Sequence, residues 1–277
     1  NDNIHSSRGL YLLLDYKSMD QFLYMSWQTI SGGLSQISVG RGNNVWGVNL
    51  QYSAGNWRQI DGAAVNVGVG ADGTVWCVNK NDEIFARSST ELIFKKCCEF
   101  ASTLELKFHD SNHDKFELFE SRIDDFNFIF KGKSRWCIIG DKNHVWGVNR
   151  QNQIFYRTNG DVNGVWVNVS GALKNVSVAA DGTVWGVNGN DDIFRWNGVS
   201  WESIAGKLKQ IYTSNASYII GTNSANEIYQ YRRGSWFKYD GSLKDVAIGI
   251  DGIIWGVNSN DQIFTRQDGG FDGPAFK

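Results

Sequence analysis

Short stretches of alternating apolar and polar residues follow one another along most of the chain, separated by turns rich in glycine and asparagine. The segment 173–178 alternates in this way, which predicts a half-buried strand. The Asp-Gly pair at 181–182 predicts a hairpin turn. Further strands are predicted at 183–188, 192–196 and 201–204. This stretch of sequence therefore encodes four short antiparallel strands.

The same four-strand unit recurs along the chain. The phrase Val-Trp-Gly-Val-Asn, or a variant of it, has its central residue at positions 46, 76, 146, 185, 220 and 255. A second tryptophan precedes a phrase centre by 19 positions in five units, at Trp27, Trp57, Trp166, Trp201 and Trp236. Four-stranded units repeated about every 35 residues are typical of the blades of a β-propeller. We predict an all-β propeller whose Val, Ile and Trp residues pack between neighbouring blades.

The two ends of the repeat are incomplete in complementary ways. The first unit opens with a fourth strand, at 27–30, and the last unit stops after a third strand, at 262–266. We expect the N-terminal strand to complete the last blade and close the ring, because this removes two exposed sheet edges. The chain then divides into an N-terminal extension, residues 1–25, and a single propeller domain, residues 26–277.

Two regions depart from the repeat. Trp46 and Trp57 are 11 positions apart, where the intact unit has 16, so we expect that blade to lack one hairpin turn and part of its third strand. Residues 88–131 lose the repeat motif but keep alternating stretches. This region is either a divergent blade, which makes seven four-stranded blades, or an insertion in a ring of six. The sequence leaves both open.

The longer phrase Gly-x-Leu-x-x-Val-Ser-Val-x-x-Asp-Gly-Thr-Val-Trp-Gly-Val-Asn-x-Asn-Asp-x-Ile-Phe, read at 171–194 and with small changes at 241–264, resembles the tectonin repeat. The resemblance covers residues 27–87 and 135–266. The family includes tachylectin-1-type lectins, fish egg lectins and slime-mould tectonins. It implies a propeller that binds glycans on microbial or cell surfaces, without catalysis, cofactor or metal. Some gastropod egg toxins carry a similar lectin chain attached to a pore-forming chain, which implies a toxin subunit as an alternative.

Two sets of residues are candidates for sugar binding, because sugar sites combine an aromatic platform with amide and carboxylate groups. The first set is the second tryptophan of the units, predicted on an outer strand: Trp57, Trp166, Trp201 and Trp236. The second set lies in polar turns at one rim of the ring: Asn79, Asp82, Asn149, Asn152, Asn188, Asp191, Asn258 and Asp261. The alternative for the first set is packing between blades. The alternative for the second is turn formation, which favours the same residue types.

Four cysteines, Cys77, Cys97, Cys98 and Cys137, have no spacing typical of a zinc or redox site. If the chain is secreted, we expect a disulfide between Cys137 and one of the adjacent pair, with another cysteine able to bond a partner chain. Four reduced, buried thiols are the alternative. Acceptor tripeptides at Asn168 and Asn215 favour a secreted glycoprotein.

Charge and motifs narrow the classes of function. The net charge of -2 gives no general attraction to nucleic acid. No apolar run approaches the roughly 20 residues of a membrane helix, so we expect no membrane insertion by this chain. No nucleophile elbow, phosphate loop or metal-ligand cluster stands out, so we expect neither an enzyme nor a metal site. We predict a secreted, multivalent carbohydrate-binding lectin of defence or egg protection, with a protein-interaction scaffold as a further alternative.

Overall fold

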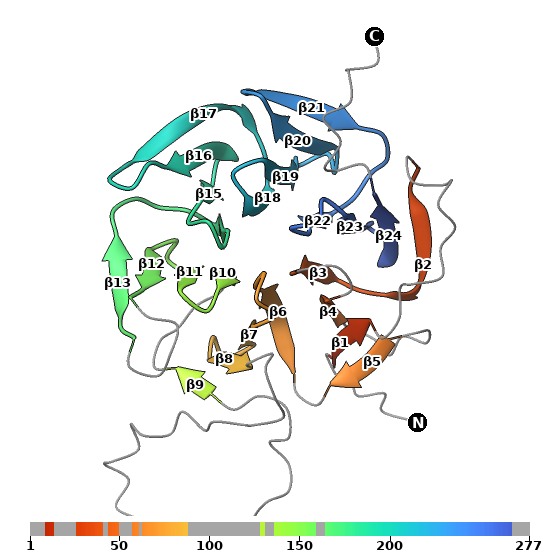
Figure 1. Cartoon of the computed structure of the whole chain (residues 1–277), viewed down its shortest axis with the longest axis horizontal. Coiled ribbons are helices and arrows are strands. Elements are labelled where there is room, and N and C mark those ends of the chain that lie inside the picture. The colour runs from red at the N-terminus through yellow and green to blue at the C-terminus, as the bar shows by residue number, and fades with distance from the viewer. Residues whose placement is uncertain are drawn as a thin grey trace, which may run out of the picture.

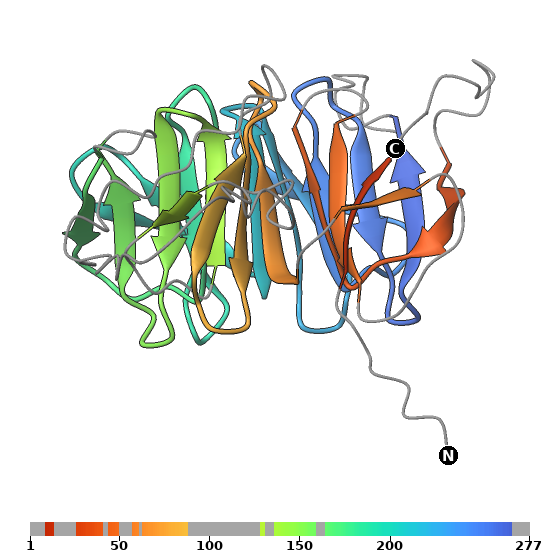
Figure 2. The ribbon, with the colours of Figure 1, turned by 90° about the horizontal axis from the view of Figure 1, so that it is seen from below.

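The computed structural model describes residues 9–13, 26–40, 44–49, 57–60, 63–87, 128–130, 136–158 and 164–267. These residues form six four-stranded antiparallel sheets arranged around a common axis (Figure 1). Seen from the side, the strands of each sheet run between the two faces of the ring (Figure 2). The predicted all-β propeller is confirmed.

The best-predicted sheet follows the unit read from the sequence. Its strands are β14 (Asn175–Val178), β15 (Val184–Val187), β16 (Asp192–Trp196) and β17 (Trp201–Lys207), with β14 innermost. Two further sheets have the same order: β10 (Trp136–Asp141), β11 (His144–Val148), β12 (Ile154–Arg157) and β13 (Trp166–Val169), then β18 (Gln210–Asn215), β19 (Tyr218–Thr222), β20 (Ile228–Arg232) and β21 (Ser235–Tyr239).

The N-terminal part of the chain completes two sheets. Strand β2 (Gln28–Gly33) pairs with β24 (Gln262–Arg266), beside β23 (Ile254–Val257) and β22 (Asp245–Ile248). The expected ring closure is therefore present. Strand β1 (Gly9–Leu13) lies between β4 (Val45–Asn49) and β5 (Trp57–Ile60), next to β3 (Gln36–Val39).

Strand β1 accounts for the short spacing between Trp46 and Trp57. The third strand that this sheet lacks between β4 and β5 is supplied by residues from the segment 1–25, which we expected to be only an extension. Because β1 pairs with both β4 and β5, it turns two unpaired strand edges into ladder hydrogen bonds.

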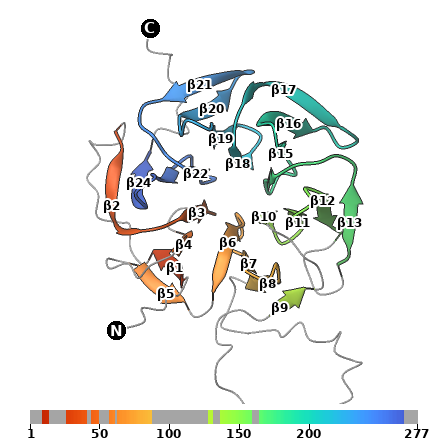
Figure 3. The same ribbon diagram turned by 180° about the vertical axis from the view of Figure 1, so that it is seen from behind.

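The sixth sheet contains β6 (Ala64–Val69), β7 (Val75–Asn79), β8 (Ile84–Arg87) and β9 (Phe128–Phe130). Strand β9 comes from the end of the divergent region and pairs with β8 as the fourth strand. Residues 88–127 lie outside the described residues. The innermost strands β3, β6, β10, β14, β18 and β22 contact one another in sequence, and β22 contacts β3 (Figure 3). The described sheets thus form a closed ring.

The first tryptophan of the units, which Ile220 replaces in one of them, lies in the core between sheets. Trp76, Trp185 and Trp255 are at most 2% exposed, and Trp46 and Trp146 are also buried. The glycine after this tryptophan has no room for a side chain. A Cβ on Gly186 would lie 2.4 Å from Leu173 Cδ1, and one on Gly256 would lie 2.3 Å from Leu243 Cδ1. The glycine and leucine therefore pack as a pair.

In the sheet of β6–β9 the larger residue of this pair is smaller and the smaller residue is larger. Cys77 stands at the glycine position of β7, and Ala64, in β6, stands where four of the other units have leucine. Both side chains are buried in the same cluster. The smaller Ala64 leaves the volume that the Cys77 side chain fills, which keeps the packing dense.

Polar side chains of the innermost strands join each sheet to the next. Gln36 Oε1 accepts from the backbone N–H of Val67, and Asn175 Oδ1 accepts from that of Ile211. Asp245 Oδ2 accepts from the N–H of Ile37 at 2.9 Å, across the junction where the ring closes. These side chains supply partners to N–H groups that lack a strand neighbour.

Tyr212 connects sheets that are not adjacent. It lies in β18, and its hydroxyl donates to the backbone carbonyl of Val39 in β3 at 2.7 Å. Tyr212 is the aromatic residue at a position that holds aliphatic or small residues in the other sheets: Ser38, Gly68, Ile138, Ser177 and Ala247. Its ring is 4% exposed, and burial raises the pKa of its hydroxyl.

Candidate functional site

The outer tryptophans lie against the preceding sheet. Trp201 Nε1 donates to the carbonyl of Ser170, and Trp236 Nε1 donates to that of Ala205 at 2.8 Å. Each indole covers a glycine of positive φ. A Cβ on Gly206, whose φ is +124°, would lie 3.0 Å from Trp236 Nε1. Trp57 makes the same contacts with Ser31 and Gly32.

Trp166 differs in its surroundings. It stands edge-on to Trp76, with ring centroids 6.5 Å apart, and the guanidinium of Arg157 lies 5.6 Å from its ring centroid. Trp57 is 7% exposed, and Trp166, Trp201 and Trp236 are half-buried. The outer tryptophans are therefore packing elements between sheets, and the partly exposed ones also present a ring edge or face to solvent.

The predicted rim asparagines form the turns in which they lie. Asn188 Oδ1 accepts from the backbone N–H groups of Asn190 and Asp192, and its Nδ2 donates to the Asp192 carboxylate. The same three contacts recur within the turns of Asn79, Asn149 and Asn258. Both ends of each amide are therefore occupied by the turn.

The last residue of each rim turn contacts the next sheet through a hydrogen bond or an ion pair. Asp82, Asn152, Asp191 and Asp261 have φ between 61° and 66°, a conformation that suits Asn and Asp. The backbone carbonyl of Asp191 accepts from Leu208 N–H, and that of Asp261 accepts from Leu34 N–H, each at 2.9 Å. Asp191 also forms an ion pair with Lys174, and Asp82 forms one with Arg150. The rim residues named from the sequence are therefore engaged in holding the turns and joining neighbouring sheets.

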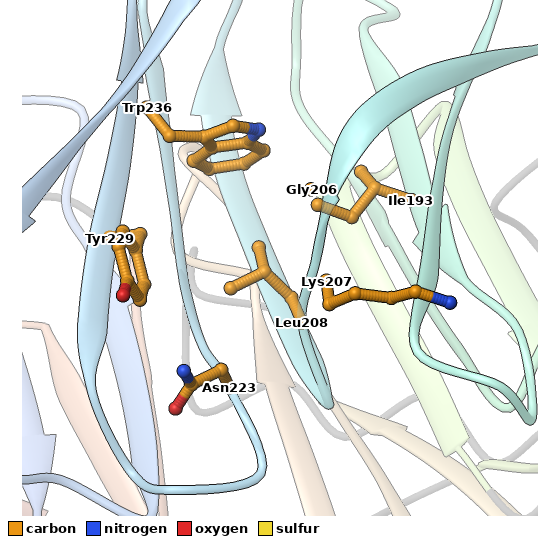
Figure 4. A pocket seen from close by; sticks show the side chains of 7 residues that line it. All are labelled: Ile193, Gly206, Lys207, Leu208, Asn223, Tyr229 and Trp236. Carbon is orange, nitrogen blue, oxygen red and sulfur yellow. The ribbon is translucent and has the colours of Figure 1, made fainter.

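A pocket of about 280 Å³ lies between the sheet of β14–β17 and the sheet of β18–β21. Trp236 and Tyr229 form one wall, while Ile193, Gly206 and Lys207 form the other, with Leu208 between them (Figure 4). Asn223 stands at one end of the pocket. Its aromatic wall and few polar groups are typical of a small-ligand site.

Charged groups hold the polar end of the pocket in place. The Glu227 carboxylate accepts from Asn223 Nδ2 at 2.7 Å and from the Tyr229 hydroxyl at 2.9 Å, and it pairs with Lys238. These contacts, that of Lys238 first, lower the pKa of Glu227 to about 2. On the opposite wall, Lys207 Nζ pairs with Asp192 at 2.5 Å. The carboxylates can accept hydrogen bonds from hydroxyl groups, and Lys207 can donate.

Of the candidates named from the sequence, Trp236 lines this pocket. The sequence reasoning missed Lys207, Asn223, Tyr229 and Glu227. Two signals were present. An acidic or amide residue follows the rim asparagine by four positions in each turn, as Glu227 follows Asn223. Tyr229 stands where Phe194 and Phe264 stand in neighbouring units, so it adds one hydroxyl to a repeated ring.

The predicted disulfide concerns residues of which only part is described. Cys97 and Cys98 lie outside the described residues. Cys137 stands in β10 opposite Gly147, as Val176 stands opposite Gly186, and Cys77 is buried. The pairing stays a prediction.

The two glycosylation candidates differ in their local contacts. Asn168 is exposed on β13, and its Nδ2 donates to the Ile154 carbonyl at 3.2 Å. Asn215 Oδ1 accepts from the N–H groups of Ser217 and Tyr218 within a turn. Glycosylation at either site stays a prediction.

Across the ranges that the structure describes, no three His, Cys, Asp or Glu side chains form a group that could hold a metal ion. No helix within those ranges has the length and apolar character needed to cross a membrane.

Comparison with known proteins connects the repeat to one family. A model of the Tectonin domain matches residues 50–107 and 135–274. Tectonin-1 of Physarum polycephalum is 47% identical over 53 residues, which cover 19% of this chain and 23% of that protein. Tectonin-2 of the same organism is 36% identical over 125 residues, 39% of this chain and 34% of that protein. The chain thus spans about a quarter to a third of the curated relatives it matches.

Solved structures resemble this chain only distantly. A streptogramin B lyase has a TM-score of 0.46 at 17% identity, over 76% of this chain and 68% of that chain. YCF48 bound to a D1 peptide has a TM-score of 0.46 at 12% identity, over 90% of this chain and 85% of that chain. These similarities carry no argument about function.

Proposed function

The chain belongs to the Tectonin domain family, and from this premise we propose that it is a lectin-like β-propeller that binds carbohydrate in the pocket beside Trp236. The pocket is the observation that carries the proposal. A sugar ring has an apolar face and a rim of hydroxyls. The pocket offers an indole and a phenol ring on one wall and ionised, hydrogen-bonded side chains within reach of that wall.

The size and fixed geometry of the pocket support a single monosaccharide unit as the ligand. Its volume is about 280 Å³, just below the usual range of small-molecule sites. The Trp236 indole is held by its hydrogen bond to Ala205, and the Glu227 carboxylate is held by three donors. Side chains that are already fixed lose little conformational entropy when a ligand binds.

Related positions occur around the ring and support several weak sites. Gly171 and Trp201 repeat the contact of Gly206 and Trp236, and so do Gly241 and Trp27. The polar groups differ, because Phe194 and Phe264 replace Tyr229 in the neighbouring sheets. We therefore propose one preferred site with weaker, more apolar counterparts, whose combined binding to a glycan surface exceeds that of each site.

The test is a glycan array followed by titration of the best monosaccharide or short glycan. The variant Tyr229→Phe removes one hydroxyl and restores the residue found in neighbouring units, so the fold is retained. Loss of one hydrogen bond should weaken binding by about fivefold. Tyr218→Phe, in β19 of the same sheet, is the matched control and should bind as the unaltered protein. An array without reproducible ligands, or equal binding by Tyr229→Phe, would overturn the proposal.

We extend the proposal to a secreted lectin of defence or egg protection. The tectonin repeat and the acceptor tripeptides at Asn168 and Asn215 support it. The toxin-subunit alternative requires a disulfide to a partner chain. Mass measurement of the natural protein without reduction separates these ideas. Attached glycan and an internal disulfide would support secretion, a larger species that collapses to 31.1 kDa on reduction would support the toxin subunit, and four free thiols without glycan would contradict both.

A further inference from the structure

Three lysines occupy the same position in three consecutive sheets. Lys174, Lys209 and Lys244 each precede the first residue of an innermost strand. Their backbone N–H groups donate to Val187, Thr222 and Val257 at 2.9, 2.8 and 2.7 Å. We call these residues the lysine triad. It lies on the face of the ring that carries the rim turns, because its side chains reach the rim turns of their own sheets.

The partners of the triad differ in charge. Lys174 pairs with the Asp191 carboxylate, and Lys244 pairs with the Asp261 carboxylate. Lys209 instead donates to the amide oxygen of Asn226, which takes the same turn position. Lys174 and Lys244 are therefore neutralised by a carboxylate, whereas Lys209 has an uncharged amide as its partner.

The charges around Lys209 leave a local excess of positive charge. Burial lowers the pKa of Lys209. The positive charges of Lys244 and Lys174 lower this pKa further, whereas the carboxylates of Asp245 and Asp191 raise it. These groups are therefore within electrostatic reach of one another. Burial also raises the pKa of Asp245 to about 7, so near neutral pH this carboxyl is only partly ionised. An anion near Lys209 would compensate both the neighbouring ammonium groups and the loss of water.

Two buried amide atoms lie next to the triad in the chain. Asn175 follows Lys174 and is 4% exposed, and Gln210 follows Lys209 and is 8% exposed. Asn175 Nδ2 and Gln210 Oε1 have no hydrogen-bond partner in the part of the chain that the structure describes. Buried polar atoms normally have a partner in the protein or in something bound to it. Asn175 Nδ2 is a donor and Gln210 Oε1 is an acceptor, so of the two only the Asn175 amide could serve an anion.

We propose that the lysine triad, with Lys209 at its centre, forms a binding site for a small dianionic oxyanion of the phosphate type. A tetrahedral oxyanion has several oxygens and can accept from more than one ammonium group. The ligand is either free phosphate or the phosphate monoester of a glycan. None of the triad lysines lines the Trp236 pocket, and this proposal does not depend on the lectin proposal.

The decisive variant is Asn226→Asp, which gives Lys209 the carboxylate partner that Lys174 and Lys244 already have. It copies neighbouring units, so the fold is retained. The matched control is Asn81→Asp. It adds the same charge in a rim turn on the same face, but in the sheet of β6–β9, which the sheet of β10–β13 separates from the sheet of Lys174. Titration calorimetry with inorganic phosphate at constant ionic strength measures the affinity, and phosphorus NMR gives an independent signal.

The unaltered protein should bind inorganic phosphate saturably. Asn226→Asp should bind at least tenfold more weakly, and Asn81→Asp should stay within twofold of the unaltered protein. Asp245→Asn removes a competing carboxylate and should bind more tightly. Equal binding of glucose 6-phosphate assigns the site to a phosphate monoester, and binding of inorganic phosphate alone assigns it to the free ion. Absence of saturable phosphate binding, or unchanged affinity in Asn226→Asp, overturns the proposal.

Discussion

Replacing Asp245 by asparagine should stabilise the ring at neutral and alkaline pH. Asp245 is buried where the last sheet meets the first, and its carboxylate accepts from the Ile37 N–H. Asn175 makes the equivalent contact with Ile211 through an uncharged amide oxygen. Asparagine at position 245 can therefore keep the hydrogen bond and the volume while removing an ionisable group.

The size of the effect follows from the pKa of this carboxyl. Burial, only partly offset by the Ile37 N–H, Lys244 and Lys209, raises the pKa of Asp245 from 3.8 to about 7. Each unit of difference between folded and unfolded states corresponds to about 1.4 kcal/mol, so the full effect is on the order of 4 kcal/mol. Well below pH 3.8, both states bind the proton and the effect vanishes. From there to about pH 7 only the unfolded state ionises fully, so stability falls as the pH rises, and above pH 7 the loss is complete.

Thermal unfolding from pH 4 to pH 8 measures this dependence. The Asp245→Asn variant should melt roughly 7 °C above the unaltered protein at pH 8, from the usual unfolding entropy of a chain of this length. The two proteins should converge as the pH falls toward 4. The converse variant, Asn175→Asp, should lose stability at pH 8 and recover it in acid. A difference that does not change with pH, or a less stable Asp245→Asn at pH 8, would refute the reasoning.

Three further predictions concern packing. Gly206→Ala should lower the free energy of unfolding, measured with urea, by about 1–3 kcal/mol, because the φ of +124° at Gly206 and the Trp236 indole exclude a Cβ. Gly198 has a φ of +99° and open space around it, so Gly198→Ala should lower the free energy of unfolding less. Equal losses in the two variants would contradict a clash between a Cβ at position 206 and the Trp236 indole. Ala64→Leu should destabilise the protein by about 1–3 kcal/mol but be tolerated together with Cys77→Gly, as a double-mutant cycle would show. Deleting residues 1–33 removes β1 and β2 and should cost several kcal/mol or prevent folding; an unchanged melting temperature would rule out their role in closure.

The sequence predicted the repeating sheets well because their signals are local. Alternation, the Asp-Gly turn and the phrase around Trp185 all lie within one unit, and β16 occupies the predicted 192–196. The closure by β2 was also predictable, since two incomplete ends of one repeat require each other. The position of β1 was not, because nothing within Gly9–Leu13 states which distant pair of strands it will join.

The candidate pocket was only partly predictable for a related reason. The rim asparagines were candidates because they repeat most regularly. Residues that repeat in every unit are those that every unit needs, and here they form the turns and the contacts between sheets. The pocket depends instead on departures from the repeat. Tyr229 replaces a phenylalanine, and Lys207 takes a position held by Ala172 in the preceding unit and Ser242 in the following one. A comparison of units position by position would have exposed both.

The pairing of β2 with β24 also sets an order of events during synthesis of the chain. Strand β2 leaves the ribosome early, but its partner β24 is made roughly 230 residues later, which at 5–20 residues per second is about 12–46 s. During that interval the β2 edge has no partner within its own sheet, whereas β3 and β4 can pair almost at once. The nascent chain therefore carries an unpaired β2 until the last sheet of the ring has been made. Chaperones that hold extended segments would have their longest opportunity there.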